Sequence, residues 1–336
     1  LYFGGGFDLS ATVKAYFALK AIGDSIDAPH MRRAREAILD HGGAARSNVF
    51  TRIQLALFGE VPWDATPVMP VELMLLPRKA FFSVWNMSYW SRAVLAPMLA
   101  VGALKPQAIN PRGIHIQELF VKPPSEVKDW IRGPYRSIWG RAFKHLDTAL
   151  RPVLPLIPKT VHDKALKAAI SFIEPRLSRG GLGAIYPAMA NVVMLYRALG
   201  VPDSDPRVVT AWESIQDLLV HKDDEIYCQP CVSPVWDTGL SGLAMMEAAS
   251  GAHPTKRDET LAKLKKSAEW LRDRQILDVK GDWAINTPDL RPGGWAFQYE
   301  NDYYPDVDDT AVVGMLLHRV DPKENHEAIE RAREWI

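Results

Sequence analysis

Three aspartates stand within four residues in the run Asp306-Val307-Asp308-Asp309-Thr310, which follows Pro305. Three carboxylates this close repel one another when all are ionised, so in a buried site they would share a proton and at least one would have a raised pKa. A carboxyl group that keeps its proton at neutral pH can serve as a general acid. The run therefore predicts an acid site, provided that the surrounding residues exclude water.

Two other interpretations of these aspartates are open. Asp309 or Thr310 could cap a helix over Thr310–Val320, because the positive end of a helix stabilises negative charge and offers free N–H groups. Carboxylate clusters also suit Mg²⁺. The setting favours an acid at one end of an apolar cavity, since the preceding segment is crowded with aromatic side chains: Trp283, Trp295, Phe297, Tyr299, Tyr303 and Tyr304.

A second unusual string, Ser233–Gly239, places the indole of Trp236 beside the carboxylate of Asp237 ahead of an expected helix. The string is also typical of a buried tryptophan followed by an aspartate N-cap. Cys228 and Cys231 have the CxxC spacing, but without a second pair or neighbouring histidines they are weak evidence for zinc or redox chemistry. The glycine-rich runs match neither the P-loop nor the dinucleotide-binding pattern.

The elements that must position these residues are helices. In Glu259–Leu271 the apolar side chains recur at three- and four-residue spacings, and the pattern returns in Val13–Ile22, Asn191–Leu199 and Thr310–Val320. Strict period-two alternation is rare, so the sequence predicts an all-α protein. Two helix types alternate at intervals of roughly 50–65 residues, which favours stacked α-hairpins in an α-solenoid or an α/α barrel.

Length and composition limit the function classes. The chain has 336 residues, enough for two domains of about 100–200 residues each, and we place these at residues 1–203 and 204–336. Forty basic and 40 acidic side chains give zero formal net charge, which excludes the diffuse basic surface of a non-specific nucleic-acid binder. No apolar run approaches the roughly 18 residues of a spanning helix, so any membrane contact must be made from the surface.

One stretch, Trp130–His162, departs from the helical pattern of the rest of the chain. It mixes large apolar side chains with arginines and lysines, a composition that resembles a helix lying in the headgroup layer of a bilayer. The alternative is a core helix whose long cations extend their charged ends to solvent. Both interpretations are compatible with the residues.

Three motifs together resemble the bacterial squalene–hopene cyclases. They are the repeat Gln275…Gly281-x-Trp283, the string Ser233–Thr238, and the run from Gly293 into Tyr303–Ala311 with its DxDDTA motif. The resemblance implies a monotopic enzyme of the bacterial cytoplasmic membrane with two α/α barrels around an apolar cavity. It also implies squalene as the substrate, hopene and hopanol as the products, and no metal or other cofactor. A homodimer is a possible assembly.

The resemblance assigns roles to nine residues. Asp308 is the protonating acid, and Asp306 and Asp309 are its carboxylate neighbours. The predicted cation-stabilising wall consists of Trp236 with Asp237, together with the aromatic residues Trp90, Trp295, Phe297 and Tyr304. The family's activating histidine and further repeats lie downstream of Ile336, so both barrels are expected to be incomplete within residues 1–336.

Two alternatives come from other functional classes. A class II diterpene cyclase also uses a DxDD motif but acts on a prenyl diphosphate, and it would need a basic or Mg²⁺-binding patch for which the sequence shows no candidate. A non-catalytic helical-repeat module would carry the acidic motif without using it. Downstream repeats and a histidine-bearing segment in the parent reading frame would favour the enzyme.

Overall fold

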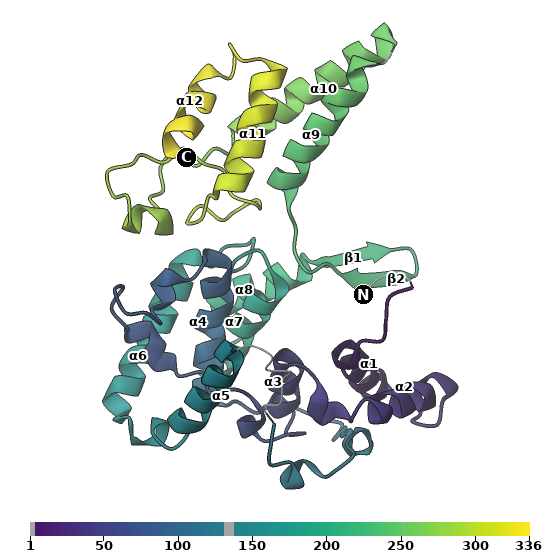
Figure 1. The fold of residues 1–336 in the computed structure, drawn as a ribbon. Coiled ribbons are helices and arrows are strands. Elements are labelled where there is room, and N and C mark those ends of the chain that lie inside the picture. The colour runs from purple at the N-terminus through teal and green to yellow at the C-terminus, as the bar shows by residue number, and fades with distance from the viewer. Residues whose placement is uncertain (1–3, 131–137, 252) are drawn as a thin grey trace. The chain divides into compact units, whose positions relative to one another are not determined.

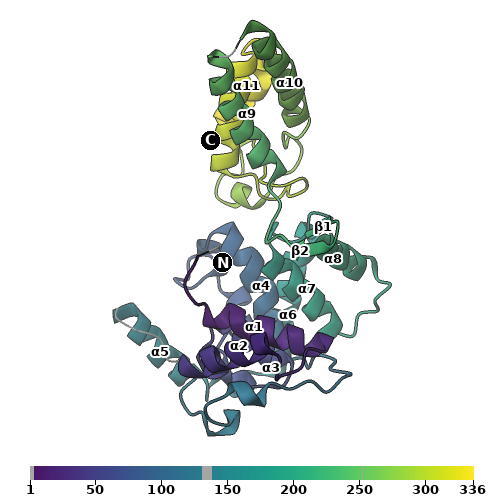
Figure 2. The same cartoon turned by 90° about the vertical axis from the view of Figure 1, so that its right-hand side faces the viewer.

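The computed structural model describes residues 4–130, 138–251 and 253–336, which are mostly helical (Figures 1 and 2). The chain divides into two compact units, Leu1–Glu72 with Val101–Lys164, and Leu73–Ala100 with Ala165–Ile336. The domain boundary predicted at residue 203 falls inside the second unit and stays a prediction. Helices α4 (Tyr89–Leu104) and α6 (Lys159–Ile173) cross the division between the units.

The first unit holds α1 (Leu9–Ile22), α2 (Pro29–Asp40), α3 (Val49–Leu57) and α5 (Ile138–Leu150). Side chains start two of these helices: Asp8 accepts a hydrogen bond from Ala11 N at 2.8 Å, and Asn48 accepts one from Thr51 N at 2.9 Å. Both are N-caps that pair otherwise free donors. Apolar faces of α1, α2 and α3 meet in one buried core that includes Val13, Tyr16, Met31, Ile38, Leu55 and Leu119.

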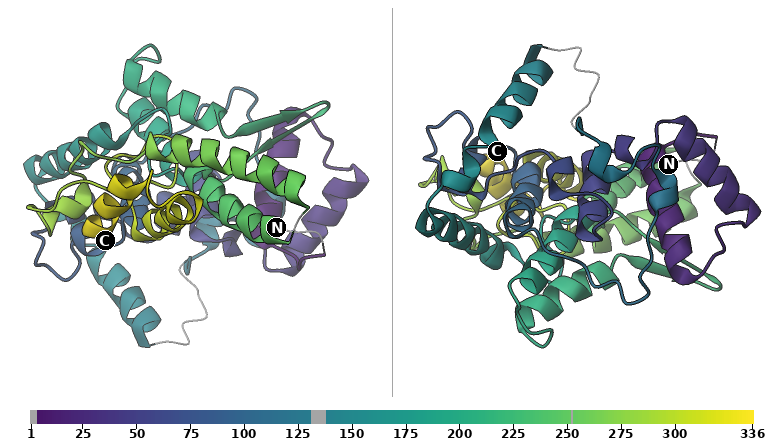
Figure 3. Two further views of the ribbon diagram at one scale, coloured as in Figure 1. Left: turned by 90° about the horizontal axis from the view of Figure 1, so that it is seen from above. Right: turned by 90° about the horizontal axis from the view of Figure 1, so that it is seen from below.

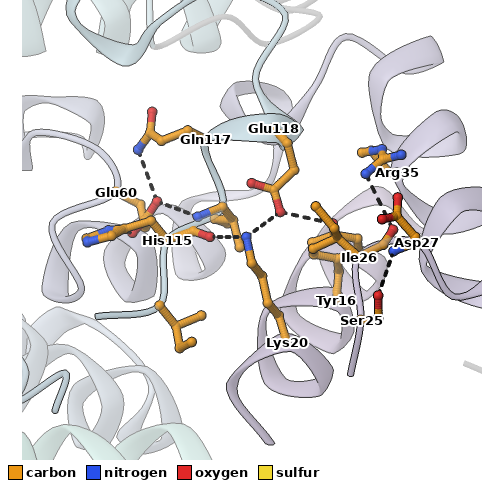
Figure 4. A network of polar contacts seen from close by, with 12 residues as sticks. Tyr16, Lys20, Ser25, Ile26, Asp27, Arg35, Glu60, His115, Gln117 and Glu118 are labelled. Atoms are coloured by element: carbon orange, nitrogen blue, oxygen red, sulfur yellow. Dashed lines mark hydrogen bonds and ion pairs between the residues drawn. The ribbon is translucent and has the colours of Figure 1, made fainter. Parts of the chain in front are cut away.

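A polar network joins distant segments of the first unit (Figure 4). The buried carboxylate of Glu60 accepts hydrogen bonds from His115 Nδ1 at 2.7 Å and from the backbone N of Ile116 at 3.0 Å. Nearby, Glu118 accepts from Lys20 Nζ at 2.6 Å and from Tyr16 OH at 3.0 Å. Burial, followed by this bond, raises the pKa of Tyr16 to about 12. The network ties α1 to the segment around residue 116.

The second unit continues with helices and one hairpin. Its further helices are α7 (Tyr186–Ala198), α8 (Pro206–Gln216), α9 (Pro234–Ser250), α10 (Pro254–Arg272), α11 (Val307–Val320) and α12 (His326–Trp335). Strands β1 (Leu219–Lys222) and β2 (Glu225–Cys228) pair antiparallel between α8 and α9 (Figure 1). The all-α prediction is confirmed apart from this hairpin, and α1, α7, α10 and α11 contain the predicted periodic segments almost entirely.

Helices α9 and α11 pack closely because α9 presents glycines at the contact. A Cβ on Gly239 would lie 2.7 Å from Val312 Cγ1, and one on Gly242 would lie 2.5 Å from Leu316 Cδ2. From the first contact to the second, the residue numbers rise in both helices, so α9 and α11 run in the same direction. The amino-terminal ends of α9 and α11 therefore lie at the same end of this packed pair.

The Gln…Gly-x-Trp repeat connects three segments of the second unit. Gln275 Nε2 donates to the carbonyls of Gly293 at 2.8 Å and Ala328 at 2.9 Å. Gly281 is required by a close approach, since a Cβ there would lie 2.0 Å from Tyr303 O. The prediction that Gln275 caps backbone groups of the turn Gly281-Asp282-Trp283 is wrong, because its amide donates to Gly293 and Ala328 instead.

Candidate active site

The acidic motif forms the start of α11. The helix begins at Val307, and its N-cap is Asp306, whose Oδ1 accepts a hydrogen bond from Asp309 N at 2.8 Å. The alternative that Asp309 or Thr310 caps the helix is therefore wrong. Thr310 Oγ1 makes two other hydrogen bonds: it donates to Asp306 O at 2.6 Å and accepts from Trp295 N at 3.0 Å.

The three aspartates occupy different environments. Asp309 is buried, with 1% of its surface exposed, whereas Asp306 is half-buried and Asp308 is exposed. Burial raises the pKa of Asp309 to about 8, with help from a hydrogen bond between its side chain and that of Asp306 and from the charges of Asp306 and Asp308. The prediction that the cluster contains a raised pKa is confirmed, and at neutral pH Asp309 holds a proton for most of the time.

The environment of Asp309 Oδ1 favours the protonated carboxyl group. This oxygen is buried and accepts no hydrogen bond from any residue that the structure describes. Buried carboxyl oxygens without a partner disfavour ionisation because nothing compensates for the lost water. The protonating role of Asp308 stays a prediction, since the raised pKa belongs to its neighbour Asp309.

The raised pKa makes folding stability depend on pH. The folded Asp309 binds a proton between about pH 4 and pH 8 that the unfolded carboxyl releases, so stability falls as pH rises through this window and levels off above it. We expect Asp309→Asn to remove this part of the dependence and Asp308→Asn to keep it. Urea unfolding of both variants from pH 4 to pH 9 measures it, and equal slopes would contradict the assignment.

Four aromatic rings from two segments form a cluster close to the acids. Tyr89 and Trp90 open α4, and Tyr304 stacks on Tyr89 with ring centroids 3.9 Å apart. Trp90 contacts Phe297 edge-on at 5.6 Å and Tyr304 at 5.9 Å. The structure thus brings together the predicted wall residues Trp90, Phe297 and Tyr304, which are all half-buried. Sequence reasoning assigned no role to Tyr89.

The other predicted wall residues lie in two different settings. Trp236 is half-buried in the first turn of α9, and Asp237 is exposed and accepts from Ser233 Oγ at 2.8 Å. Asp237 is not the N-cap, because α9 begins three residues earlier at Pro234. The packing of α9 on α11 places these two residues at the level of the acidic motif.

Trp295 lies in the core of α9–α12. It is fully buried, and its indole N–H donates to Leu271 O at 2.6 Å. Its carbonyl accepts from Asp306 N at 3.1 Å, so its backbone aligns the segment that leads into the acids. These contacts are structural, and a contact of Trp295 with substrate stays a prediction.

A buried charged triad adjoins the aromatic cluster. The carboxylate of Asp282 lies between the guanidinium groups of Arg92 and Arg176. Burial, together with the charge of Asp282, raises the pKa of Tyr89. Sequence reasoning missed this triad because its members stand 84 and 106 residues apart along the chain. The one local signal was the position of Asp282 inside the Gly-x-Trp motif.

Cys228 is exposed, Cys231 is half-buried, and both thiols are free. Among the described residues, no three or more histidine, cysteine, aspartate or glutamate side chains are placed to hold a metal ion.

The stretch Trp130–His162 contains more than one element. Residues 131–137 lie outside the described residues; α5 follows, then a 3₁₀ turn at Leu154–Leu156 and the start of α6. Helix α5 lies at the edge of its unit (Figure 3). Large apolar side chains in this stretch are exposed, namely Ile138, Phe143, Leu146, Val153 and Leu156. The alternative of a buried core helix is therefore wrong for α5. No helix in the described ranges is long and apolar enough to cross a membrane.

Comparisons with known proteins cover the chain from end to end. Residues 1–224 match the squalene-hopene cyclase N-terminal domain, and residues 232–336 match the squalene-hopene cyclase C-terminal domain. A squalene-hopene cyclase of Schizosaccharomyces japonicus is 62% identical over 100% of the chain and 51% of its own length.

Two bacterial relatives with the same name also match the whole chain. Squalene–hopene cyclases of Bradyrhizobium diazoefficiens and Alicyclobacillus acidocaldarius are 51% and 36% identical, over 99% and 100% of the chain and 50% and 52% of their own lengths. The chain spans about half the length of these curated relatives. Because both fungal and bacterial proteins are similar to this chain, the similarity does not show that the chain comes from a bacterium. With both domain models matched in order and its acidic motif at the head of α11, the chain belongs to the squalene-hopene cyclase family.

Proposed function

We propose that the intact protein containing this chain cyclises squalene to hopene and hopanol, with the aspartates of α11 as the proton source. The observation that carries the proposal is the buried Asp309, whose pKa is raised to about 8 beside Asp306 and Asp308. An isolated alkene is a very poor base, so only an acid that is still protonated at neutral pH can start the reaction. The cluster meets that requirement with the chain's own residues.

The proposed reaction balances without a cofactor. A carboxyl proton of the cluster, assigned to Asp308, moves to a terminal alkene carbon, and successive π-bonds supply the electrons of the new C–C bonds. The last cation loses a proton to give hopene, or it adds water and then loses a proton from that oxygen to give hopanol. The ionised carboxylate regains a proton from solvent, for which the exposure of Asp308 provides a route.

The aromatic cluster suits the cations of this reaction. Faces of Trp90, Phe297 and Tyr304 can stabilise positive charge by about 2 kcal/mol or more each where water is excluded. Unlike hydroxyl or amine groups, the ring faces do not capture a carbocation. A cavity that holds the polyene pre-folded also removes much of the entropy cost of closing several rings. The wall roles of Trp236 and Asp237 belong to the same proposal.

Substrate choice tests the function directly. The intact protein should convert squalene to pentacyclic products identified by mass spectrometry, and it should leave a prenyl diphosphate unchanged. Turnover of the diphosphate alone would favour a class II diterpene cyclase. Turnover of neither substrate by folded protein would favour a non-catalytic helical-repeat protein.

We further propose that the protein attaches to one face of a bilayer through the stretch that contains α5. Exposed apolar side chains on α5 and on the following turn accompany basic residues such as Arg141 and Lys144. This combination is typical of helices that lie in the headgroup layer. An insoluble substrate such as squalene would then reach the cavity from the bilayer. A homodimer stays a prediction.

The attachment should be hydrophobic. We expect the intact protein to sediment with membranes and to be released by detergent but not by high salt, and Phe143→Glu with Leu156→Glu to shift most of it to the supernatant. As a control, Val209→Glu with Ile226→Glu places the same charges at exposed apolar positions elsewhere. Release of the unmodified protein by salt alone would leave only electrostatic attachment.

A further inference from the structure

The buried triad joins three segments that are distant in the sequence. Arg92 belongs to α4, Arg176 ends the 3₁₀ turn after α6, and Asp282 begins the turn Asp282–Ile285. Arg92 NH2 lies 3.3 Å from Asp282 Oδ2, and Arg176 NH2 and Nε donate to the two carboxylate oxygens. The side chains are 9% exposed for each arginine and 2% for the aspartate.

Aromatic rings enclose the charges of the triad. The Arg176 guanidinium lies 4.1 Å from the ring centroid of Phe172 and 5.1 Å from that of Tyr303. The Arg92 guanidinium lies 5.2 Å from the Trp85 ring. With two cations and one anion, the triad carries a formal net charge of one positive unit. Removal of the carboxylate would leave two like charges in a water-poor environment, where charges repel most strongly.

Asp282 also holds the segment that carries the other half of the aromatic cluster. Its backbone N–H donates to Tyr303 O at 3.0 Å, next to Tyr304. Tyr304 stacks on Tyr89, whose hydroxyl donates to Asn301 Oδ1 at 2.8 Å. Arg92 follows Tyr89 by three residues, so the carboxylate of Asp282 fixes one side of the stack and its backbone fixes the other.

We propose that Asp282 is a positioning residue, which holds Tyr89 and Trp90 of α4 against Phe297 and Tyr304 and thereby sets how completely the substrate cyclises. The inference rests on the proposed function. Each cation must form under an aromatic face, and small displacements of positioned groups lower rates strongly. A loosened stack should let intermediates lose a proton before the last rings close.

The test begins with Asp282→Asn in the intact protein. The amide keeps the size of the side chain but leaves the guanidinium groups without a counter-charge. We expect the share of partly cyclised products to rise about tenfold, the KM for squalene to change by less than about threefold, and the near-ultraviolet circular dichroism of the Tyr–Trp cluster to weaken. Asp289→Asn is the matched control, because Asp289 is an exposed acid seven residues further along the chain. It should change none of the three.

A second variant separates positioning from stability. Asp282→Asn combined with Arg92→Gln removes one positive charge, so it should recover the melting temperature that the single variant loses. The proposal predicts that the double variant still releases partly cyclised products. A return to the unmodified product profile, or unfolding of both variants while Asp289→Asn stays folded, would make Asp282 a stability residue and overturn the proposal.

Circular dichroism distinguishes failure of the positioning role from failure of the proposed function. It is recorded without substrate, so it reports on the aromatic cluster even when no product forms. A protein that leaves squalene unchanged, with a weakened signal in Asp282→Asn, would refute the proposed function alone. An unchanged signal with an unchanged product profile would refute the positioning role alone.

Discussion

Replacing Asp308 by asparagine is expected to lower squalene turnover by about 10²–10⁴-fold, the range over which a general acid acts. The amide has nearly the size of the carboxyl group but cannot give a proton to an alkene. Because Asp308 is exposed at the start of α11 and its side chain supports no core contact, the fold should persist. Product formation measured beside a melting curve tests this.

Asp309→Asn is the informative companion to this variant. Asp309 is the aspartate of the cluster with the raised pKa, and it donates its backbone N–H to Asp306. Asp309→Asn should lower turnover by about 10–10²-fold, which is less than the effect of Asp308→Asn. Asp308 remains as the proton donor in this variant, and only the carboxyl proton of Asp309 is lost. The reverse order, or near-normal activity in Asp308→Asn, would move the protonating role to Asp309.

Phe297→Ala should change the products more than the binding of squalene. The ring contacts Trp90 at 5.6 Å and is half-buried, so its loss removes one aromatic face and leaves a void in the wall. A lost stabilisation of about 2 kcal/mol corresponds to about a 30-fold change in the rate of the affected ring closure. Partly cyclised hydrocarbons should therefore accumulate.

The neighbouring Tyr299 supplies the control for this prediction. It is an aromatic residue only two positions away, but it is 58% exposed and contacts Trp270 instead. Tyr299→Ala should keep the product profile of the unmodified protein, as gas chromatography with mass spectrometry would record. If Phe297→Ala kept that profile at an unchanged rate, Phe297 would be a core residue without a role in cyclisation.

Local patterns in the sequence predicted the segments that form α1, α7, α10 and α11, because apolar side chains recur there at three- and four-residue spacings. They failed at helix starts, which depend on one hydrogen bond: α11 begins at Val307 because Asp306, and not Asp309, caps it. The short hairpin Leu219–Cys228 was missed because four-residue strands give too little alternation to recognise.

In the candidate site too, features set by neighbouring residues were predicted, and features set by tertiary packing were not. The crowding of three aspartates predicted a raised pKa, but its location on Asp309 depends on burial, which spacing does not reveal. Trp295 was predicted with the wall because of its neighbours, and only the packing of α9–α12 places its ring in the core. The triad of Arg92, Arg176 and Asp282 depends wholly on tertiary structure.

Cyclisation in deuterated water shows whether the carboxyl groups of α11 protonate an alkene. Carboxyl protons exchange with solvent, whereas the C–H bond formed by protonation does not. We predict one non-exchangeable deuterium in each hopene and hopanol molecule, located by fragmentation on the ring that closes first, and no such product from Asp308→Asn. Cyclised products without deuterium from the unmodified protein would show that these carboxyl groups do not protonate the substrate.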